Sequence, residues 1–206
     1  MLSKRILIVV LMITTSWIVS NAQDAQVQDR WSIGPRGGVN FANVSNVDES
    51  QSITGIVIGL TTTYSFNENT GLTLEALYSV EGYKAPFSEF HLRYLQIPLY
   101  FDYFFGQLGD RLRPKVYAGI VPGFFLGGTA NELDVNHDFY NKVLVAASAG
   151  FGVNYRVGNR IWLNADLRSY LGLSDIRSEA NQTGESIKPS NIQLSLGICY
   201  GISKLD

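Results

Sequence analysis

The sequence is short of the residues that define several classes of protein. Its one cysteine, Cys199, cannot form an intrachain disulfide and has no CxxC partner for metal or redox chemistry. Charged residues make up 17% of the 206 residues, against roughly 25% in typical soluble domains. The formal net charge is −2, so no basic excess is available to neutralise nucleic-acid phosphates. These shortages exclude a disulfide scaffold, a disordered chain and a nucleic-acid-binding protein.

The chain also lacks the long apolar run that a membrane-spanning helix requires. Such a helix needs about 20 apolar residues to cross the hydrocarbon of a bilayer. The apolar run at 6–19 is shorter and is interrupted by polar side chains. It follows Lys4 and Arg5 and leads to the small residues Ser20 and Ala22, which is typical of a secretory signal peptide with its cleavage site. We therefore predict a signal peptide at 1–22, a short periplasmic leader at 23–30 and one domain at 31–206.

The domain has a regular alternation of apolar residues with polar or small ones. From Trp31 onward the period is two, which indicates β-strands whose two faces meet different surroundings. In the last such segment, for example, Ile192 and Leu194 alternate with Gln193 and Ser195. The pattern predicts eight strands, at 31–44, 53–66, 71–84, 91–105, 115–127, 140–156, 160–171 and 191–203. Consecutive strands joined only by turns predict an all-β fold, an eight-stranded antiparallel up-and-down β-barrel.

Composition predicts that the apolar face of this barrel meets lipid rather than the interior of a soluble barrel. Glycines gather on the polar face, where a narrow lumen needs small side chains. Five lysines follow residue 22, too few for a solvated outer surface of this size. Seven aromatic residues fall at strand ends that share one rim, as in the aromatic girdle of a membrane barrel: Trp31, Tyr64, Phe66, Tyr103, Phe105, Tyr155 and Tyr200. We therefore predict a transmembrane β-barrel in the lipid bilayer of a bacterial outer membrane.

The predicted connections alternate in length. Outer-membrane barrels have short periplasmic turns, long external loops and both termini in the periplasm. Any protein partner is expected at the extracellular loops 128–139 and 172–190. The alternative is that these loops are polar connections without a partner. The longer connections lie at 45–52, 85–90, 128–139 and 172–190, and the shorter ones at 67–70, 106–114 and 157–159.

The polar face of the predicted strands carries four acids and five bases. The lumen of an eight-stranded barrel is only wide enough for side chains, so we predict that these charges pair into a structural plug. An ion pathway or gate is the functional alternative. Cys199 is expected as a small filler on the same wall. The predicted lumen polar network comprises Arg36, Glu75, Glu81, Asp102, Lys115, Lys142, Arg156, Asp166 and Arg168.

Four short motifs follow one another along the domain: IGPRGGVN at 33–40, YLQIPL at 94–99, YAG at 117–119 with PG at 122–123, and YLGLSDI at 170–176. In sequence and order they resemble the first, fourth, fifth and seventh strands of the PorT-like outer-membrane β-barrel family of the Bacteroidetes. The resemblance covers essentially the whole chain after the signal peptide. It implies an integral outer-membrane protein, in a family whose namesake is implicated in protein secretion.

The two histidines raise the alternative of catalysis. His91 lies near Ser88 and Glu89, and His137 is next to Asp138, all at the end of the long loops. Outer-membrane lipid-modifying hydrolases use a Ser/His/acid set, but nothing in the spacing here requires one. A metal site formed by these histidines and Asp138 is weaker still, because the ligand spacing matches no known arrangement. We therefore predict no catalytic residue, no metal site and no cofactor.

Taken together, the sequence predicts a monomeric, non-enzymatic integral outer-membrane β-barrel. Its role is expected to be structural, or to lie in binding or secretion, and to be exerted through the extracellular loops. The alternatives are an outer-membrane lipid-modifying hydrolase and a periplasmic, lipocalin-like carrier of a small apolar ligand.

Overall fold

A computed structural model describes most of the predicted domain. The described residues are 30–44, 51–85, 88–108, 110–131, 133–134, 139–177 and 187–202. The predicted signal peptide and nearly all of the predicted leader lie outside them. Within the described part of the chain, no helix is long and apolar enough to cross a membrane.

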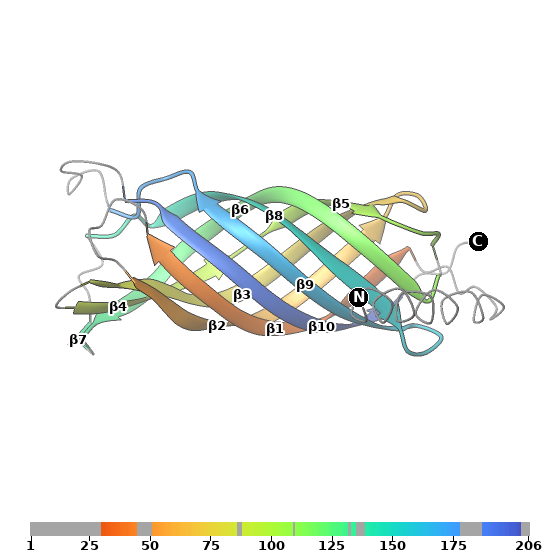
Figure 1. Cartoon of the computed structure of the whole chain (residues 1–206), viewed down its shortest axis with the longest axis horizontal. Helices are drawn as coiled ribbons and strands as arrows, with labels where there is room; N and C mark the ends of the chain where they lie inside the picture. The colour runs from red at the N-terminus through yellow and green to blue at the C-terminus, as the bar shows by residue number, and fades with distance from the viewer. Residues whose placement is uncertain are drawn as a thin grey trace, which may run out of the picture.

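The described chain consists of β-strands that wind around one barrel (Figure 1). The strands are β1 (Trp31–Val44), β2 (Gln51–Ser65), β3 (Thr70–Ala85), β4 (Ser88–Gln96), β5 (Leu99–Phe104), β6 (Leu112–Ala130), β7 (Leu133–Asp134), β8 (Val143–Arg156), β9 (Ile161–Gly172) and β10 (Pro189–Gly201).

Antiparallel pairing closes the barrel. Each wall strand pairs with its neighbours in chain order, and β1 pairs with both β2 and β10. Trp31 faces Tyr64 on β2, and Ser32 faces Gly201 on β10, so the first and last strands meet without leaving an open edge. The predicted antiparallel up-and-down arrangement is confirmed.

The predicted strand 91–105 is interrupted at Ile97 and Pro98, which separates β4 from β5. Proline has no N–H to give to a sheet, so regular pairing stops there. The wall continues nevertheless: the Ile97 N–H donates to the Pro122 carbonyl at 2.9 Å, and the Pro98 carbonyl accepts from the Glu75 N–H at 3.0 Å. Because β4 and β5 together make one wall strand and β7 pairs only with β6, the wall has the predicted eight strands.

The barrel has a turn end and a loop end. The connections 66–69, 105–111 and 157–160 define the turn end, and 45–50, 86–87, 131–142 and 173–188 define the loop end. The prediction of a long loop at 85–90 is wrong, because β3 and β4 continue to Ala85 and Ser88. Tyr83 and Phe90 stack across this extended hairpin with ring centroids 4.8 Å apart, which stabilises pairing beyond the expected strand ends.

The apolar face of the barrel points outward. Leu196 is 65% exposed and Ile192 is 52% exposed, whereas their polar strand neighbours Ser195 and Gln193 are buried. Water would make such a continuous apolar exterior unfavourable, but lipid does not. The aromatic residues of the turn end pack side by side at the rim, with the Trp31 and Tyr64 rings 4.8 Å apart. The predicted assignment of the two faces is confirmed.

Candidate functional site

The lumen is filled along its length by side chains of three kinds. The inward residues of β3 follow this order from the turn end to the loop end: Thr73 and Glu75 lie in a charged region, Ser79 and Glu81 in a polar one, and Tyr83 in an aromatic one. All five are buried. Because successive inward positions are two residues apart on a strand, one strand reaches all three regions.

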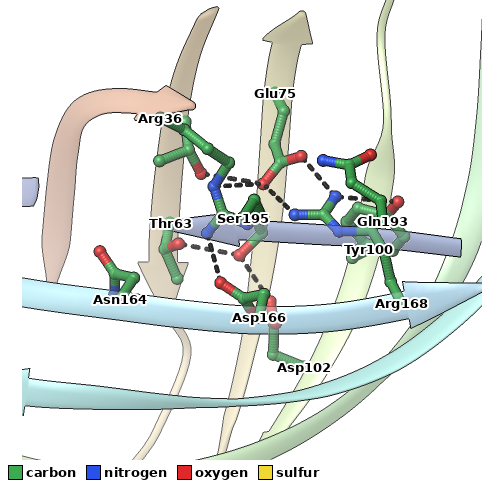
Figure 2. Close-up of polar contacts among 12 residues, drawn as sticks. Arg36, Thr63, Glu75, Tyr100, Asp102, Asn164, Asp166, Arg168, Gln193 and Ser195 are labelled. Atoms are coloured by element: carbon green, nitrogen blue, oxygen red, sulfur yellow. Dashed lines mark hydrogen bonds and ion pairs between the residues drawn. The ribbon is translucent and has the colours of Figure 1, made fainter. Parts of the chain in front are cut away.

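Six charged residues form what we call the central cluster, shown in part in Figure 2. Three bases face three acids, so the formal charge of the cluster is zero. The members come from five strands and are each at most 5% exposed: Arg36, Glu75, Asp102, Lys115, Asp166 and Arg168.

Ion pairs link the central cluster across the lumen (Figure 2). Arg168 Nη1 lies 2.7 Å from Glu75 Oε2, and Arg36 Nη2 lies 2.7 Å from Asp166 Oδ2. Arg36 Nε also approaches Glu75 Oε1 at 3.3 Å. Lys115 Nζ lies 3.2 Å from Asp166 Oδ1 and 3.5 Å from Asp102 Oδ1. Every charge in the cluster therefore has an opposite charge within ion-pair distance, as buried ions require.

Uncharged side chains complete the surroundings of Arg168. Its Nη1 donates to the Tyr100 hydroxyl at 3.1 Å, and its guanidinium lies 5.1 Å from the centroid of that ring. The Tyr170 hydroxyl donates to Gln193 Oε1 at 2.6 Å. Gly150 supplies the necessary space, because a Cβ there would lie 2.8 Å from both the Tyr117 ring and the Arg168 side chain. The close approach of these groups explains why this lumen position carries no side chain.

The lumen is closed at the turn end. Arg113 is buried, its guanidinium lies 4.2 Å from the Phe104 ring centroid, and its Nη2 donates to the Glu68 carbonyl at 2.7 Å. Leu108 and Trp162 are also buried at this end. Arg113 was not among the predicted site residues, because the predicted strand began at Lys115. The same alternation extended by two positions would have placed it in the lumen.

A second polar region, which we call the Glu81 layer, separates the central cluster from the loop end. Glu81 Oε1 accepts from Gln96 Nε2 at 2.7 Å, from Asn191 Nδ2 at 2.9 Å and from Ser79 Oγ at 3.0 Å. Ser79 Oγ in turn accepts from Asn40 Nδ2 at 2.7 Å. Among the described residues, no cation lies within ion-pair distance of Glu81. The layer therefore holds a buried carboxylate among neutral donors.

Apolar and aromatic residues cover the Glu81 layer at the loop end, and we call them the loop-end cap. Phe125 stacks on Tyr140 with ring centroids 5.2 Å apart, and its ring centroid lies 5.6 Å from that of Tyr94. The cap thus separates the polar lumen from the loops. The buried members are Val44, Tyr83, Leu92, Tyr94, Tyr140, Leu144 and Ile176.

A short segment at 175–177, which we call the strap, crosses the cap. Arg177 Nη2 lies 3.0 Å from Asp175 Oδ2, and the backbone N–H groups of Arg177 and Ile187 donate to the same carboxylate at 2.8 and 3.2 Å. Burial alone would raise the pKa of Asp175, but the hydrogen bonds from Arg177 and Ile187 outweigh it and hold this pKa below its ordinary value. The strap is therefore fastened by an ionised carboxylate.

A cavity of about 360 Å³ lies beside the strap at the loop end. Its wall is mainly aromatic, with one guanidinium from the strap. This combination suits a partner group with apolar surface and a polar edge. The lining residues are Tyr83, Phe90, Phe139, Tyr140, Ile176, Arg177 and Ile187.

Two of the predicted network residues lie elsewhere. Lys142 is exposed, because β8 begins at Val143 and the alternation expected from residue 140 does not apply before it. Arg156 is half-buried at the turn end of β8. The structure places the other seven in the lumen and brings six of them into the central cluster, leaving Glu81 in its own layer. Cys199 is buried on the lumen wall.

The predicted alternative of catalysis finds little in the described chain. The His91 side chain is 42% exposed, and its Nε2 lies 3.1 Å from Glu89 Oε1. The Ser88 hydroxyl accepts instead from Asn131 Nδ2 at 3.3 Å. His137 and Asp138 lie outside the described residues. Within those residues, no group of three histidine, cysteine, aspartate or glutamate side chains is placed to hold a metal ion.

The closed barrel with its lipid-facing exterior agrees with what comparison of the sequence finds. Residues 21–178 match the model of the family described as outer membrane protein beta-barrel domain. The chain belongs to this family. It is therefore a protein of the bacterial outer membrane, embedded in the lipid bilayer. No curated protein matches the sequence significantly.

Solved structures of other outer-membrane barrels share the fold. Neisserial surface protein A is similar with a TM-score of 0.59 and 17% identity, over 84% of this chain and 97% of that one. Outer membrane protein OprG from Pseudomonas aeruginosa gives 0.52 and 15%, over 87% and 100%. The E. coli outer membrane protein W gives 0.50 and 17%, over 86% and 100%. At these identities the similarity establishes the architecture alone.

Proposed function

We propose that this outer-membrane barrel is a non-conducting, non-enzymatic protein that binds a partner at its loop end. The observation that carries the proposal is the contrast between the two parts of the interior. The lumen is occupied by the central cluster and closed by Phe104 and Arg113, whereas the loop end has an open-sided aromatic cavity. A pathway through the barrel would need the ion pairs to separate, while binding at the cavity needs no such change.

The aromatic wall of the cavity supports binding. Tyr and Phe provide large apolar contact areas at low entropic cost, and Arg177 places its guanidinium, ion-paired with Asp175, at the edge. The loop end is proposed to face the cell exterior, as long loops do in outer-membrane barrels. In contrast, the described residues enclose no apolar chamber for a carrier function, because they fill the centre of the barrel with charged side chains. Among the described residues, the exposed His91 contacts Glu89 and Ser88 contacts Asn131, so the His91–Ser88 pair that hydrolysis would need is not formed.

The proposal extends to a role linked with protein secretion. This part rests on the resemblance of the four motifs at 33–40, 94–99, 117–123 and 170–176 to the PorT-like proteins of the Bacteroidetes. The fold itself does not distinguish such a role from others. Deleting the gene tests it: proteins normally exported should be lost from the culture medium, and an unchanged set of exported proteins would contradict the secretion role.

Two measurements test the core of the proposal. In planar lipid bilayers the purified barrel should produce no conductance steps. In native membranes, a photo-crosslinking amino acid in place of Phe139, at the cavity, should capture a partner. The matched control is the same replacement at Phe105, an exposed aromatic residue at the turn end. Conductance steps from the native barrel, or equal capture from both positions, would refute binding at the loop end as the function.

A further inference from the structure

A groove of about 670 Å³ hollows the lipid-facing surface across β1, β10, β9 and β8, which are neighbours in the wall (Figure 1). Small residues at outward positions, Gly37 and Ala165, leave it open between larger ones such as Leu196 and Tyr155. A Cβ added at Gly37 would meet no atom closer than 3.7 Å, whereas one at the adjacent Gly38 would collide with a backbone carbonyl of β10. The strand pairing therefore does not require a glycine at position 37, and its effect is to keep the groove open.

The groove runs obliquely from the middle of the lipid-facing surface to the turn end. Gly37 pairs with Leu196, Leu196 with Ala165, and Ala165 with Val153. Gly37 is near the middle of β1, whereas Val153 is close to Arg156, the turn-end residue of β8. These four positions cross three interstrand spacings, about 14 Å. This path is about as long as the hydrocarbon of one leaflet is deep, which is half of roughly 30 Å.

An arginine is held at the turn-end mouth of the groove. Tyr155 forms part of the lining, and the Arg111 guanidinium lies 5.4 Å from the centroid of its ring. Arg111 is exposed, and no carboxylate among the described residues lies within ion-pair distance of it. The adjacent Asp110 accepts instead from the Gln107 N–H at 2.6 Å. The mouth thus presents a positive charge that the described chain does not neutralise, at the edge of the membrane.

We propose that this groove binds one glycerophospholipid, with an acyl chain along Gly37 and Ala165 and the phosphate on Arg111. Arginine binds phosphate oxygens through paired, charge-assisted hydrogen bonds. A lipid that bridged the hollow would lose van der Waals contacts that a chain inside it makes. The groove follows the curved wall of the barrel, which a flexible chain can do and a rigid fused-ring lipid cannot. The site lies on the outer wall and is independent of any partner at the loop end.

Native mass spectrometry of the purified barrel in mild detergent tests the recognition of phosphate. Dioleoyl phosphatidylglycerol is compared with dioleoylglycerol, which has the same chains but no phosphate. The phospholipid should form a one-to-one complex and bind about tenfold or more tightly, because only it has a charged acceptor for Arg111. Arg111→Gln should remove this preference. The control Lys142→Gln, at an exposed base of the loop end, should keep it.

A second pair of variants tests the groove itself. Ala165→Leu fills the groove and should weaken phospholipid binding, whereas Ala149→Leu, at an exposed outward position of β8 outside the lining, should not. If Ala165→Leu does not give the folded barrel, Gly37→Leu fills the same groove from β1. Equal binding of the two lipids, or unchanged phospholipid binding in the filled variant, would overturn the proposal. A dimer of barrels that Ala165→Leu dissociates would overturn it too, by assigning the groove to a second copy of the chain.

Discussion

The pairing of Arg168 with Glu75 leads to a quantitative prediction about the central cluster. Replacing Arg168 with methionine keeps much of the side-chain volume but leaves three acids facing two bases. Glu75 Oε2 then loses the guanidinium at 2.7 Å, and the Tyr100 hydroxyl loses a donor at 3.1 Å. Removing one partner of a buried ion pair typically costs about 3–5 kcal/mol of the free energy of unfolding. We expect a cost of this order here because Glu75 keeps Arg36 at 3.3 Å but the cluster as a whole is left with one buried negative charge that no base compensates.

The double replacement Arg168→Met with Glu75→Gln makes the prediction specific. It leaves Arg36 and Lys115 with Asp102 and Asp166, so the formal charge of the cluster returns to zero. Removing both members of a buried pair is often nearly neutral. The double variant should therefore be more stable than Arg168→Met alone by about 2 kcal/mol or more, even though it carries an additional substitution.

The free energy of unfolding is obtained by urea titration of the barrel in lipid vesicles, with tryptophan fluorescence reporting folding. Trp31 and Trp162 lie at the turn end and serve as the reporters. If the two single substitutions simply add in the double variant, the charges do not act as a balanced group. If Arg168→Met costs less than about 1 kcal/mol, the ion pair does not stabilise the lumen as its geometry indicates.

Three further predictions concern the lumen wall, the lipid face and the strap. Gly150→Ala should lower the free energy of unfolding by about 1–3 kcal/mol in the same titration, because the added Cβ would lie 2.6 Å from a backbone carbonyl oxygen. The control Gly123→Ala, whose Cβ would have its nearest atom at 3.9 Å, should be tolerated, and equal costs for the two would contradict close packing at Gly150. Leu196→Arg, in the middle of the lipid-facing surface, should lower the free energy of unfolding by about 2–4 kcal/mol, and Leu133→Arg, at the loop end, by about 0–1 kcal/mol. The reverse order would show that the bilayer surrounds the loop end instead. Because the pKa of Asp175 is lowered, its hold on the strap is complete above its ordinary pKa of about 3.9 and is lost as pH falls through the lowered value. In hydrogen-exchange measurements, the two backbone N–H groups that donate to this carboxylate should lose protection in that acid range, and Asp175→Asn should remove the pH dependence. Unchanged protection in acid would show that the carboxylate does not fasten the strap.

The alternation of the sequence was sufficient to predict which side chains face the lumen, because lipid and a polar interior impose opposite requirements on successive residues. The rule holds only inside a strand. Lys142 lies one residue before the start of β8, where the alternation does not apply, and Arg113 lies inside β6 but before the start of the predicted strand. The ends of β3 and β4 were also missed, because the Tyr83–Phe90 stacking that lengthens them connects different segments and has no signal in either one.

The partners of the lumen charges were not predictable for a different reason. Alternation tells which face a residue occupies, but height along the barrel depends on strand tilt and on the register of every pair. Arg36 and Asp166 are 130 residues apart in sequence, and they meet because of the registers of β1 with β10 and of β10 with β9. The alternation of the sequence was enough to predict that the lumen charges form one group. The separation of Glu81 from that group could be seen only from the strand registers of the structure.

Arg36 connects these registers in a way that favours one closed barrel over slipped alternatives. From β1 it contacts Glu75 on β3, Asp166 on β9 and Ser195 on β10. It therefore joins a strand that follows it closely in the chain to two strands near the end of the domain. A slip of β1 against β10 by two residues preserves the lipid-facing pattern, since the period of a strand is two. The same slip would move the guanidinium along the lumen by roughly 7 Å, away from both carboxylates. The apolar exterior therefore selects the membrane and the inward face, and the buried charges select the register in which the barrel closes.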